Sequence, residues 1–167
     1  ENRQRFESGY LKLLAVKLKE RQGRVLPGIK SILETLSRHE HVHLGLLTGN
    51  FEHGARQKLE HFDLNHFFDF GAYGDHHASR NDVAREAIKQ IQQRHTPESL
   101  AETSIWVIGD TPSDIHCARA IGANVIAVAT GVYPPEELRA CEPDYLFEHF
   151  EEIEPILSLF AAPETTN

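Results

Sequence analysis

The sequence predicts an open α/β fold, in which a Rossmann-like parallel sheet is flanked by helices. From residue 41 onward, short apolar runs alternate with amphipathic stretches, and the connections between them are short. Such alternation is typical of parallel strands joined by crossover helices. Polar loops follow the apolar runs, and ligands of open parallel sheets bind beyond the carboxyl ends of the strands. The strand ends are therefore where chemistry is expected.

The periodicity of apolar residues gives the individual elements. Strands are expected at residues 42–47, 67–72, 104–108, 124–128 and 145–147. Helices are expected at residues 28–38, 52–62, 82–95, 113–121, 135–140 and 151–160. In the helix at 82–95, for example, Val83, Ala87 and Ile91 fall on one face.

The first residues differ from the rest of the chain. Residues 6–22 have a mostly helical apolar pattern that Gly23 ends. This helix is either part of a helical cap or is packed on the core, and the sequence favours neither. We divide the chain into this segment at 1–24, an α/β core at 25–160 and a frayed tail at 161–167.

Composition restricts the class of protein. The chain has 167 residues and a formal net charge of -8, so a general nucleic-acid or anionic-membrane surface is not expected. No apolar run approaches the roughly 18–20 residues of a membrane span, and the first residues do not form a signal peptide. Cys117 and Cys141 are interpreted as free thiols in a reducing compartment, which favours the cytoplasm.

Asp110 and Asp114 are the strongest candidate pair. Asp110 follows the third expected strand and Gly109, and Asp114 opens the next helix. Two carboxylates this close repel each other unless a cation or a proton lies between them, and Mg²⁺ prefers oxygen ligands. Helix capping explains Ser113 or Asp114 but not Asp110 at the strand end. The pair therefore predicts a magnesium site.

Thr48 and Arg80 are the candidate phosphate ligands. Thr48 ends the first strand, and its hydroxyl with the backbone N–H groups of Gly49 and Asn50 could bind phosphate oxygens. An ordinary turn with Asn50 as helix cap is the alternative. Arg80 lies in the expected loop after the second strand, and a guanidinium binds phosphate as a fork. The alternative is a solvated arginine or one paired with Asp82.

Histidines are the other conspicuous polar residues. His39, His41 and His43 alternate, so they would share one face of a strand. With no cysteine nearby and no helical Glu/His pair, a polar edge is favoured over zinc. His76 and His77 lie near the expected cleft, and contact with substrate is the less favoured interpretation.

Several of these stretches resemble motifs of the haloacid-dehalogenase-like hydrolases, in particular the phosphoglycolate-phosphatase-like branch. Residues 107–115 resemble the fourth motif and are the most specific stretch, and residues 46–50 resemble the second. Residues 26–29 resemble the Pro-Gly turn before the second motif, and residues 120–128 the continuation after the fourth. The similarity covers residues 25–160 in the expected order.

The resemblance implies a hydrolase of small phosphate monoesters that uses Mg²⁺ and an aspartyl-phosphate intermediate. Thr48 would hold the transferring phosphoryl group with the backbone of Gly49 and Asn50. Arg80 stands where the third motif supplies a cation, usually lysine. An arginine there keeps the positive charge, but replaces the compact lysine ammonium with a planar guanidinium that can donate two hydrogen bonds in parallel.

The resemblance also assigns the acidic residues. Asp110 would bind Mg²⁺, and Asp114 would bind it or orient its ligands. The family's first motif, an Asp-x-Asp pair that supplies the nucleophile and the general acid and base, does not occur, since the first aspartate is Asp63. The chain contains no methionine, and we expect the missing motif upstream of residue 1 and the chain alone to be inactive.

Three alternatives stay open. One is a catalytically inactive homologue used for binding, and another is a dehalogenase-type hydrolase, which would need no magnesium. A phospho-receiver domain ranks last, because its acidic cluster should lie on an early strand. The sequence identifies neither the substrate nor the oligomeric state.

Overall fold

The computed structural model describes residues 2–20, 23–75, 77 and 79–160, so the expected tail at 161–167 and His76 lie outside it. Its strands are β1 (Gly45–Leu47), β2 (Phe70–Ala72), β3 (Trp106–Gly109), β4 (Asn124–Val128) and β5 (Tyr145–Phe147). Its helices are α1 (Asn2–Glu20), α2 (Ile29–Leu36), α3 (Glu52–His61), α4 (Arg80–Arg94), α5 (Pro97–Ala101), α6 (Pro112–Ala120), α7 (Pro135–Ala140) and α8 (Glu154–Ser158). A 3₁₀ turn, η1, spans Asn65–Phe67.

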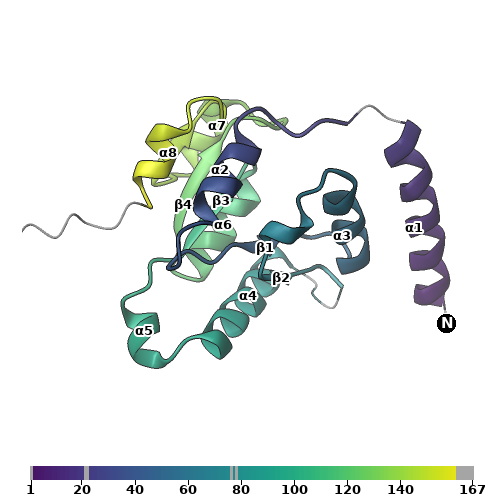
Figure 1. The fold of residues 1–167 in the computed structure, drawn as a ribbon, viewed down its shortest axis with the longest axis horizontal. Helices are drawn as coiled ribbons and strands as arrows, with labels where there is room; N and C mark the ends of the chain where they lie inside the picture. The colour runs from purple at the N-terminus through teal and green to yellow at the C-terminus, as the bar shows by residue number, and fades with distance from the viewer. Residues whose placement is uncertain (1, 21–22, 76, 78, 161–167) are drawn as a thin grey trace, which may run out of the picture.

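The strands form two parallel sheets rather than one. β1 pairs with β2, while β3, β4 and β5 pair in that order. Leu47 of β1 packs both on the core beneath β3 and β4 and on the smaller cluster beneath β2, so the sheets lie side by side (Figure 1). Within the described residues, β1 and β3 each have one edge without a strand partner. The expected α/β fold is confirmed, but the sheet is interrupted between β1 and β3.

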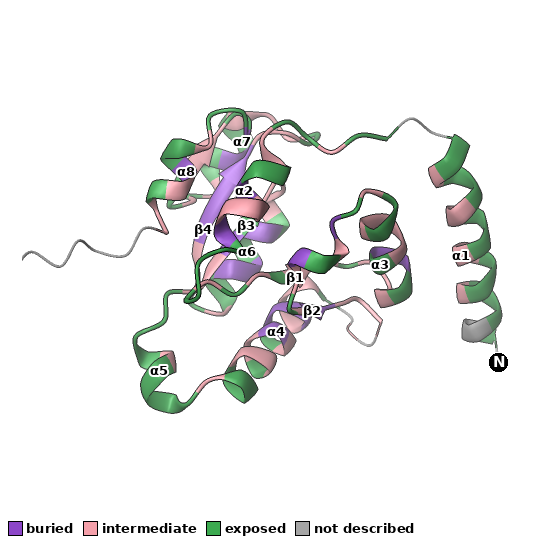
Figure 2. Cartoon of the chain, viewed as in Figure 1, coloured by how far each residue is buried: buried purple, intermediate pink, exposed green. Residues whose placement is uncertain are grey.

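β4 shows why the larger sheet is stable. Successive strand residues point to opposite faces, and all four residues from Val125 to Val128 are fully buried (Figure 2). Val125 and Ala127 pack with residues of α6 and α7. Ile126 and Val128 pack with residues of α2 and α8 on the other face. Helices therefore cover both faces of this sheet.

α1 lies against α3. The Tyr10 ring meets Phe51 edge-on with a centroid distance of 6.0 Å, and the Glu7 carboxylate contacts His53 at 3.0 Å. Leu13 and Val16 remain largely exposed. The division at residue 24 stays a prediction, and so do both interpretations of this helix, as part of a cap or as packed on the core. None of the described helices has both the length and the apolar character that crossing a membrane requires.

Several elements differ from the expected ones. Phe67 belongs to η1 and not to the second strand, which begins at Phe70, because the N–H of Phe67 donates back to Leu64 O in a tight turn. α5 was not expected. Its start has a clear signal, since the Thr96 side chain caps the helix and proline follows.

Arg80 is the first residue of α4 and does not lie in a loop. The helix begins two residues earlier than expected because Ser79 caps it, its hydroxyl accepting from the N–H of Asp82 at 3.2 Å. The Asp82 carboxylate pairs with Arg85 at 2.8 Å. The alternative partner considered for Arg80 is therefore engaged elsewhere, and a fixed helix start holds the Arg80 backbone.

Candidate active site

Thr48 continues β1 and begins the first strand-end loop. Its N–H donates to Ala72 O at 3.0 Å, which extends the pairing with β2. Its Oγ1 accepts from the N–H of Asn50 at 3.2 Å and from Asn50 Nδ2 at 2.7 Å. The hydroxyl thus sits at the carboxyl end of β1, in a turn whose geometry the Asn50 side chain helps to define.

The loop after β2 is hydrogen-bonded to the loop after β1 and to the start of α3. The N–H of Gly74 donates to Asn50 O at 3.0 Å, and Asp75 Oδ2 accepts from the N–H of Glu52 at the start of α3 at 2.7 Å. The approach requires glycine, because a Cβ at residue 74 would lie 2.2 Å from Gly49 O. Gly74 and Asp75 were not predicted as site residues, because their contacts depend on two loops meeting.

Arg80 connects the two sheets. Its Nη2 donates to the Asp114 carboxylate and to Leu47 O, the latter at 3.4 Å. Its Nη1 lies 3.7 Å from the position that a Cβ on Gly49 would occupy. Its Nε is buried and has no acceptor within the described part of the chain. The guanidinium therefore lies beside both neighbours of Thr48, and its buried Nε–H donor is left unused by the described residues.

Asp114 is buried at 4% exposure and holds four hydrogen bonds. Its Oδ2 accepts from the N–H of Asp110 at 3.2 Å, from the N–H of Thr111 at 3.1 Å and from Thr111 Oγ1 at 2.9 Å. Its Oδ1 accepts from Arg80. Thr111 and Asp114 form a capping box at the start of α6. The capping role considered for Asp114 is confirmed, with Thr111 as the cap residue.

Asp110 directly follows β3 and is half-buried. Its carboxylate lies against Gly131, in the loop after β4, where a Cβ would come within 2.2 Å of Asp110 Oδ2. Gly131 was not predicted as a site residue, although a glycine just beyond a strand end was a usable signal. The absence of a side chain there leaves room for the carboxylate.

These residues suit Mg²⁺ in part. Carboxylate oxygens are the ligands that Mg²⁺ prefers, and none of the described residues donates a hydrogen bond to the Asp110 carboxylate. The Asp114 oxygens already serve four donors, so Asp110 is the better direct ligand and Asp114 the better orienting group. No three of the described His, Cys, Asp and Glu side chains gather as a metal cage. Mg²⁺ usually keeps several waters and substrate oxygens among its ligands, and these would complete its coordination.

Cys117 lies on α6 close to this cluster but is unsuited to act as a nucleophile. Burial raises the pKa of its thiol, which keeps it protonated and unreactive. Its Sγ donates to Asp114 O at 3.2 Å. Both cysteines are free, as expected from the sequence.

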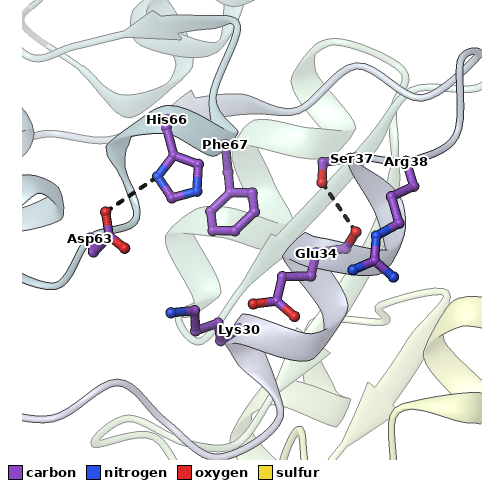
Figure 3. A pocket seen from close by; sticks show the side chains of 7 residues that line it. All are labelled: Lys30, Glu34, Ser37, Arg38, Asp63, His66 and Phe67. Carbon is purple, nitrogen blue, oxygen red and sulfur yellow. Dashed lines mark hydrogen bonds and ion pairs between the residues drawn. The ribbon is translucent and has the colours of Figure 1, made fainter.

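A crevice of about 380 Å³ opens elsewhere, between α2 and η1 (Figure 3). It is lined by Lys30, Glu34, Ser37, Arg38, Asp63, His66 and Phe67. Cations and carboxylates alternate around it, and Asp63 contacts His66 at 3.6 Å. None of the strand-end residues lines it, so it is separate from the candidate site.

The fold and the strand-end cluster together define the class. This is an α/β protein with a hydroxyl, a guanidinium and two carboxylates gathered at the carboxyl ends of its strands. The chain belongs to the haloacid dehalogenase-like hydrolase family, whose model matches residues 3–128. The resemblance carried by residues 46–50 and 107–115 is thereby confirmed.

Two curated relatives carry the name of the expected branch. The chain is 27% identical over 125 residues to a phosphoglycolate phosphatase of Synechococcus elongatus and 26% identical over 133 residues to one of Aliivibrio fischeri. These matches cover 75% and 80% of the chain. The chain spans only 55% and 56% of those two proteins.

Solved structures share the fold. A haloacid dehalogenase-like hydrolase of Streptococcus pneumoniae matches with a TM-score of 0.69 and 24% identity, over 83% of this chain and 60% of that one. CbbY of Rhodobacter sphaeroides, solved in complex with xylulose-(1,5)-bisphosphate, matches with a TM-score of 0.68 and 19% identity. That match covers 84% of this chain and 60% of CbbY.

Proposed function

We propose that the protein containing this chain hydrolyses small phosphate monoesters through an aspartyl-phosphate intermediate. The observation that carries the proposal is the interruption between β1 and β3. Thr48, Arg80 and Asp110 lie at the carboxyl ends on either side of it. The nucleophile would lie on a strand outside these 167 residues that fills the interruption.

The edges of β1 and β3 that are unpaired within the described residues would accommodate a further parallel strand at this interruption. A strand paired with both free edges would satisfy their backbone groups, as neighbouring parallel strands do. Its carboxyl end would then emerge between Thr48 on one side and Asp110 on the other. An Asp-x-Asp sequence there would bring its carboxylates to the Arg80 guanidinium, whose Nε has no acceptor among the described residues.

The reaction would need two displacements. In the first, the nucleophilic aspartate forms a bond to phosphorus while the ester P–O bond breaks, and the second aspartate protonates the leaving alcohol. In the second displacement, the second aspartate takes a proton from water, and the water oxygen attacks phosphorus. The bond between phosphorus and the nucleophilic aspartate breaks, which releases inorganic phosphate and restores the free carboxylate. Throughout, the Thr48 hydroxyl and the N–H groups of Gly49 and Asn50 would hold the phosphoryl oxygens.

Charge neutralisation is the other requirement, since the phosphoryl group and the nucleophile are both anionic. Arg80 would supply one cation, and its bond to Asp114 would fix its direction. Asp110 would hold Mg²⁺, which when bound would neutralise further phosphate charge. A dehalogenase would not require Asp110 in this role, so the carboxylate beside Gly131 favours a phosphatase.

The names of the relatives support a small phosphorylated substrate, since both curated matches above are phosphoglycolate phosphatases. The bisphosphate bound to CbbY is of the same chemical class. The two free cysteines favour a reducing compartment, and we assign the protein to the cytoplasm.

Chemical trapping tests the intermediate. The intact protein is mixed with p-nitrophenyl phosphate and Mg²⁺, then quenched and treated with borohydride, which reduces an aspartyl phosphate to homoserine. Peptide mass spectrometry should find one homoserine in a segment preceding Glu1. Turnover without homoserine, or homoserine within these 167 residues, would contradict the proposal. An untreated sample is the control.

A further inference from the structure

Lys58 reaches the strand-end loop from α3. Its Nζ donates to Asn50 Oδ1 at 2.8 Å, and Asn50 Nδ2 donates to Thr48 Oγ1 at 2.7 Å. Three half-buried side chains thus form one hydrogen-bonded chain that ends on the candidate phosphate ligand. Nothing in the motif resemblance points to Lys58.

The direction of each hydrogen bond follows from the chemistry of the groups. A lysine ammonium only donates, so the amide of Asn50 must turn its oxygen to Lys58. Its NH₂ group must then face Thr48. The Thr48 oxygen accepts both from this group and from the N–H of Asn50 at 3.2 Å. With both lone pairs engaged, the Thr48 hydroxyl has only its own proton left to give.

The backbone of the loop is held independently. The N–H of Gly74 donates to Asn50 O, and the N–H of Thr48 donates to Ala72 O, each at 3.0 Å. The remaining freedom is the orientation of the Asn50 amide, and its two orientations have opposite effects. If its oxygen faced Thr48, the hydroxyl would donate to it and would be lost as a donor to a ligand.

We infer that Lys58 is a positioning residue, which acts through Asn50 to keep the Thr48 hydroxyl a donor toward the phosphoryl group. The part about the phosphoryl group rests on the proposed function, whereas the orientation of the amide does not. Two other lysines pair with carboxylates, Lys17 with Glu20 at 2.7 Å and Lys89 with Glu86 at 3.4 Å. Lys58 instead pairs with a neutral amide in the strand-end loop.

The first test reads the amide directly in this chain and needs no turnover. In NMR spectra of labelled protein, the Asn50 side-chain NH₂ protons should show a nuclear Overhauser effect to Thr48. Lys58→Met should lose at least half of that intensity. Lys58→Arg, which keeps a donor, and Lys89→Met, a matched change on α4, should retain it. Undiminished intensity in Lys58→Met would overturn the inference.

The second test uses kinetics of the intact protein with p-nitrophenyl phosphate. Lys58→Met should lower kcat by on the order of tenfold, since one site donor is misdirected in part of the molecules. Lys58→Arg should restore most of it. In an Asn50→Ala background, Lys58→Met should change kcat by less than about twofold, because residues acting in one network are not additive.

The outcomes separate the two proposals. An equal loss of kcat in both backgrounds would show that Lys58 acts without Asn50 and would overturn the inference. A kcat for Lys58→Met equal to that of the parent would do the same. Failure of the parent protein itself to hydrolyse phosphate esters would count against the proposed function, and the NMR result would then decide the role of Lys58. Thermal unfolding of each variant verifies its fold.

Discussion

Arg80 donates a hydrogen bond to Asp114 and thereby joins the start of α4 to the start of α6. The two residues lie on opposite sides of the interruption between β1 and β3. Their contact is the most direct link between the half of the site at Thr48 and the half at Asp110. It also fixes the direction of the guanidinium, which is the proposed phosphate ligand.

Removing the acceptor tests the structural importance of this link. Asp114→Ala leaves Arg80, Thr111 and the N–H of Asp110 without their shared partner, so the free energy of unfolding should fall by about 3 kcal/mol. Urea unfolding of this chain measures the difference. The control is Asp69→Ala, which removes an exposed carboxylate that contacts His43 at 3.4 Å and should cost less than about 0.5 kcal/mol. An equal decrease in the free energy of unfolding of the two variants would show that the contact between Arg80 and Asp114 contributes no more stability than an exposed ion pair.

The position of Asp110 depends on Gly131. Gly131→Ala places a methyl group within 2.2 Å of Asp110 Oδ2, which is too close, so the carboxylate must turn away. In the intact protein, the Mg²⁺ concentration for half-maximal turnover should rise about tenfold, as for other changes that misplace a metal ligand. The midpoint of urea unfolding should change little. Gly9→Ala is the control, because nothing lies within 4 Å of the added methyl group. An unaltered magnesium requirement in Gly131→Ala would remove Asp110 from the metal site.

The sequence predicted best where burial alone decides the structure. β4 has its expected bounds of Asn124–Val128, because every residue after Asn124 is buried between two helical layers. The proximity of Asp110 and Asp114 also followed from a strand end and a helix start four residues apart. β1 is shorter than expected and begins at Gly45, since it pairs on one side only.

Other features depend on contacts between distant segments, which periodicity does not report. The Asp110 carboxylate lies against Gly131, which belongs to the loop after the next strand along the chain. Lys58 lies on α3 and donates back to Asn50 in the loop that precedes this helix. The helix start at Arg80 was readable from the Ser79 cap, but the loop composition of residues 73–79 obscured it.

The ionisation of Asp144 makes the free energy of unfolding depend on pH in the acid range. Its carboxylate accepts from Arg119 Nη1 at 2.8 Å and from the N–H of Val125 at 2.7 Å. The hydrogen bond from Arg119, followed by the one from Val125, lowers the pKa of Asp144 from its ordinary value of 3.8. The unfolded chain therefore binds the proton more readily. The stabilisation is complete above pH 3.8 and is lost as pH falls through the lower pKa of the folded state.

Asp144→Asn should consequently lower the free energy of unfolding by about 1 kcal/mol at pH 7, a modest value because the ion pair is partly exposed and screened. The difference between the two proteins should shrink as pH falls below the ordinary carboxyl value. Urea unfolding at pH 7 and pH 3 measures it. A difference that is constant with pH would mean that the charge of Asp144 contributes nothing.

We propose a magnesium-dependent phosphatase whose metal is held at Asp110. The measurement that tests it most directly is the turnover of p-nitrophenyl phosphate by the intact protein and its Asp110→Asn variant, each with Mg²⁺ and with a chelator. We expect turnover that the chelator abolishes and that Mg²⁺ restores, and a loss of at least about a hundredfold in the variant with its fold intact. Turnover that persists in chelator, or near-normal activity of Asp110→Asn, would contradict the account.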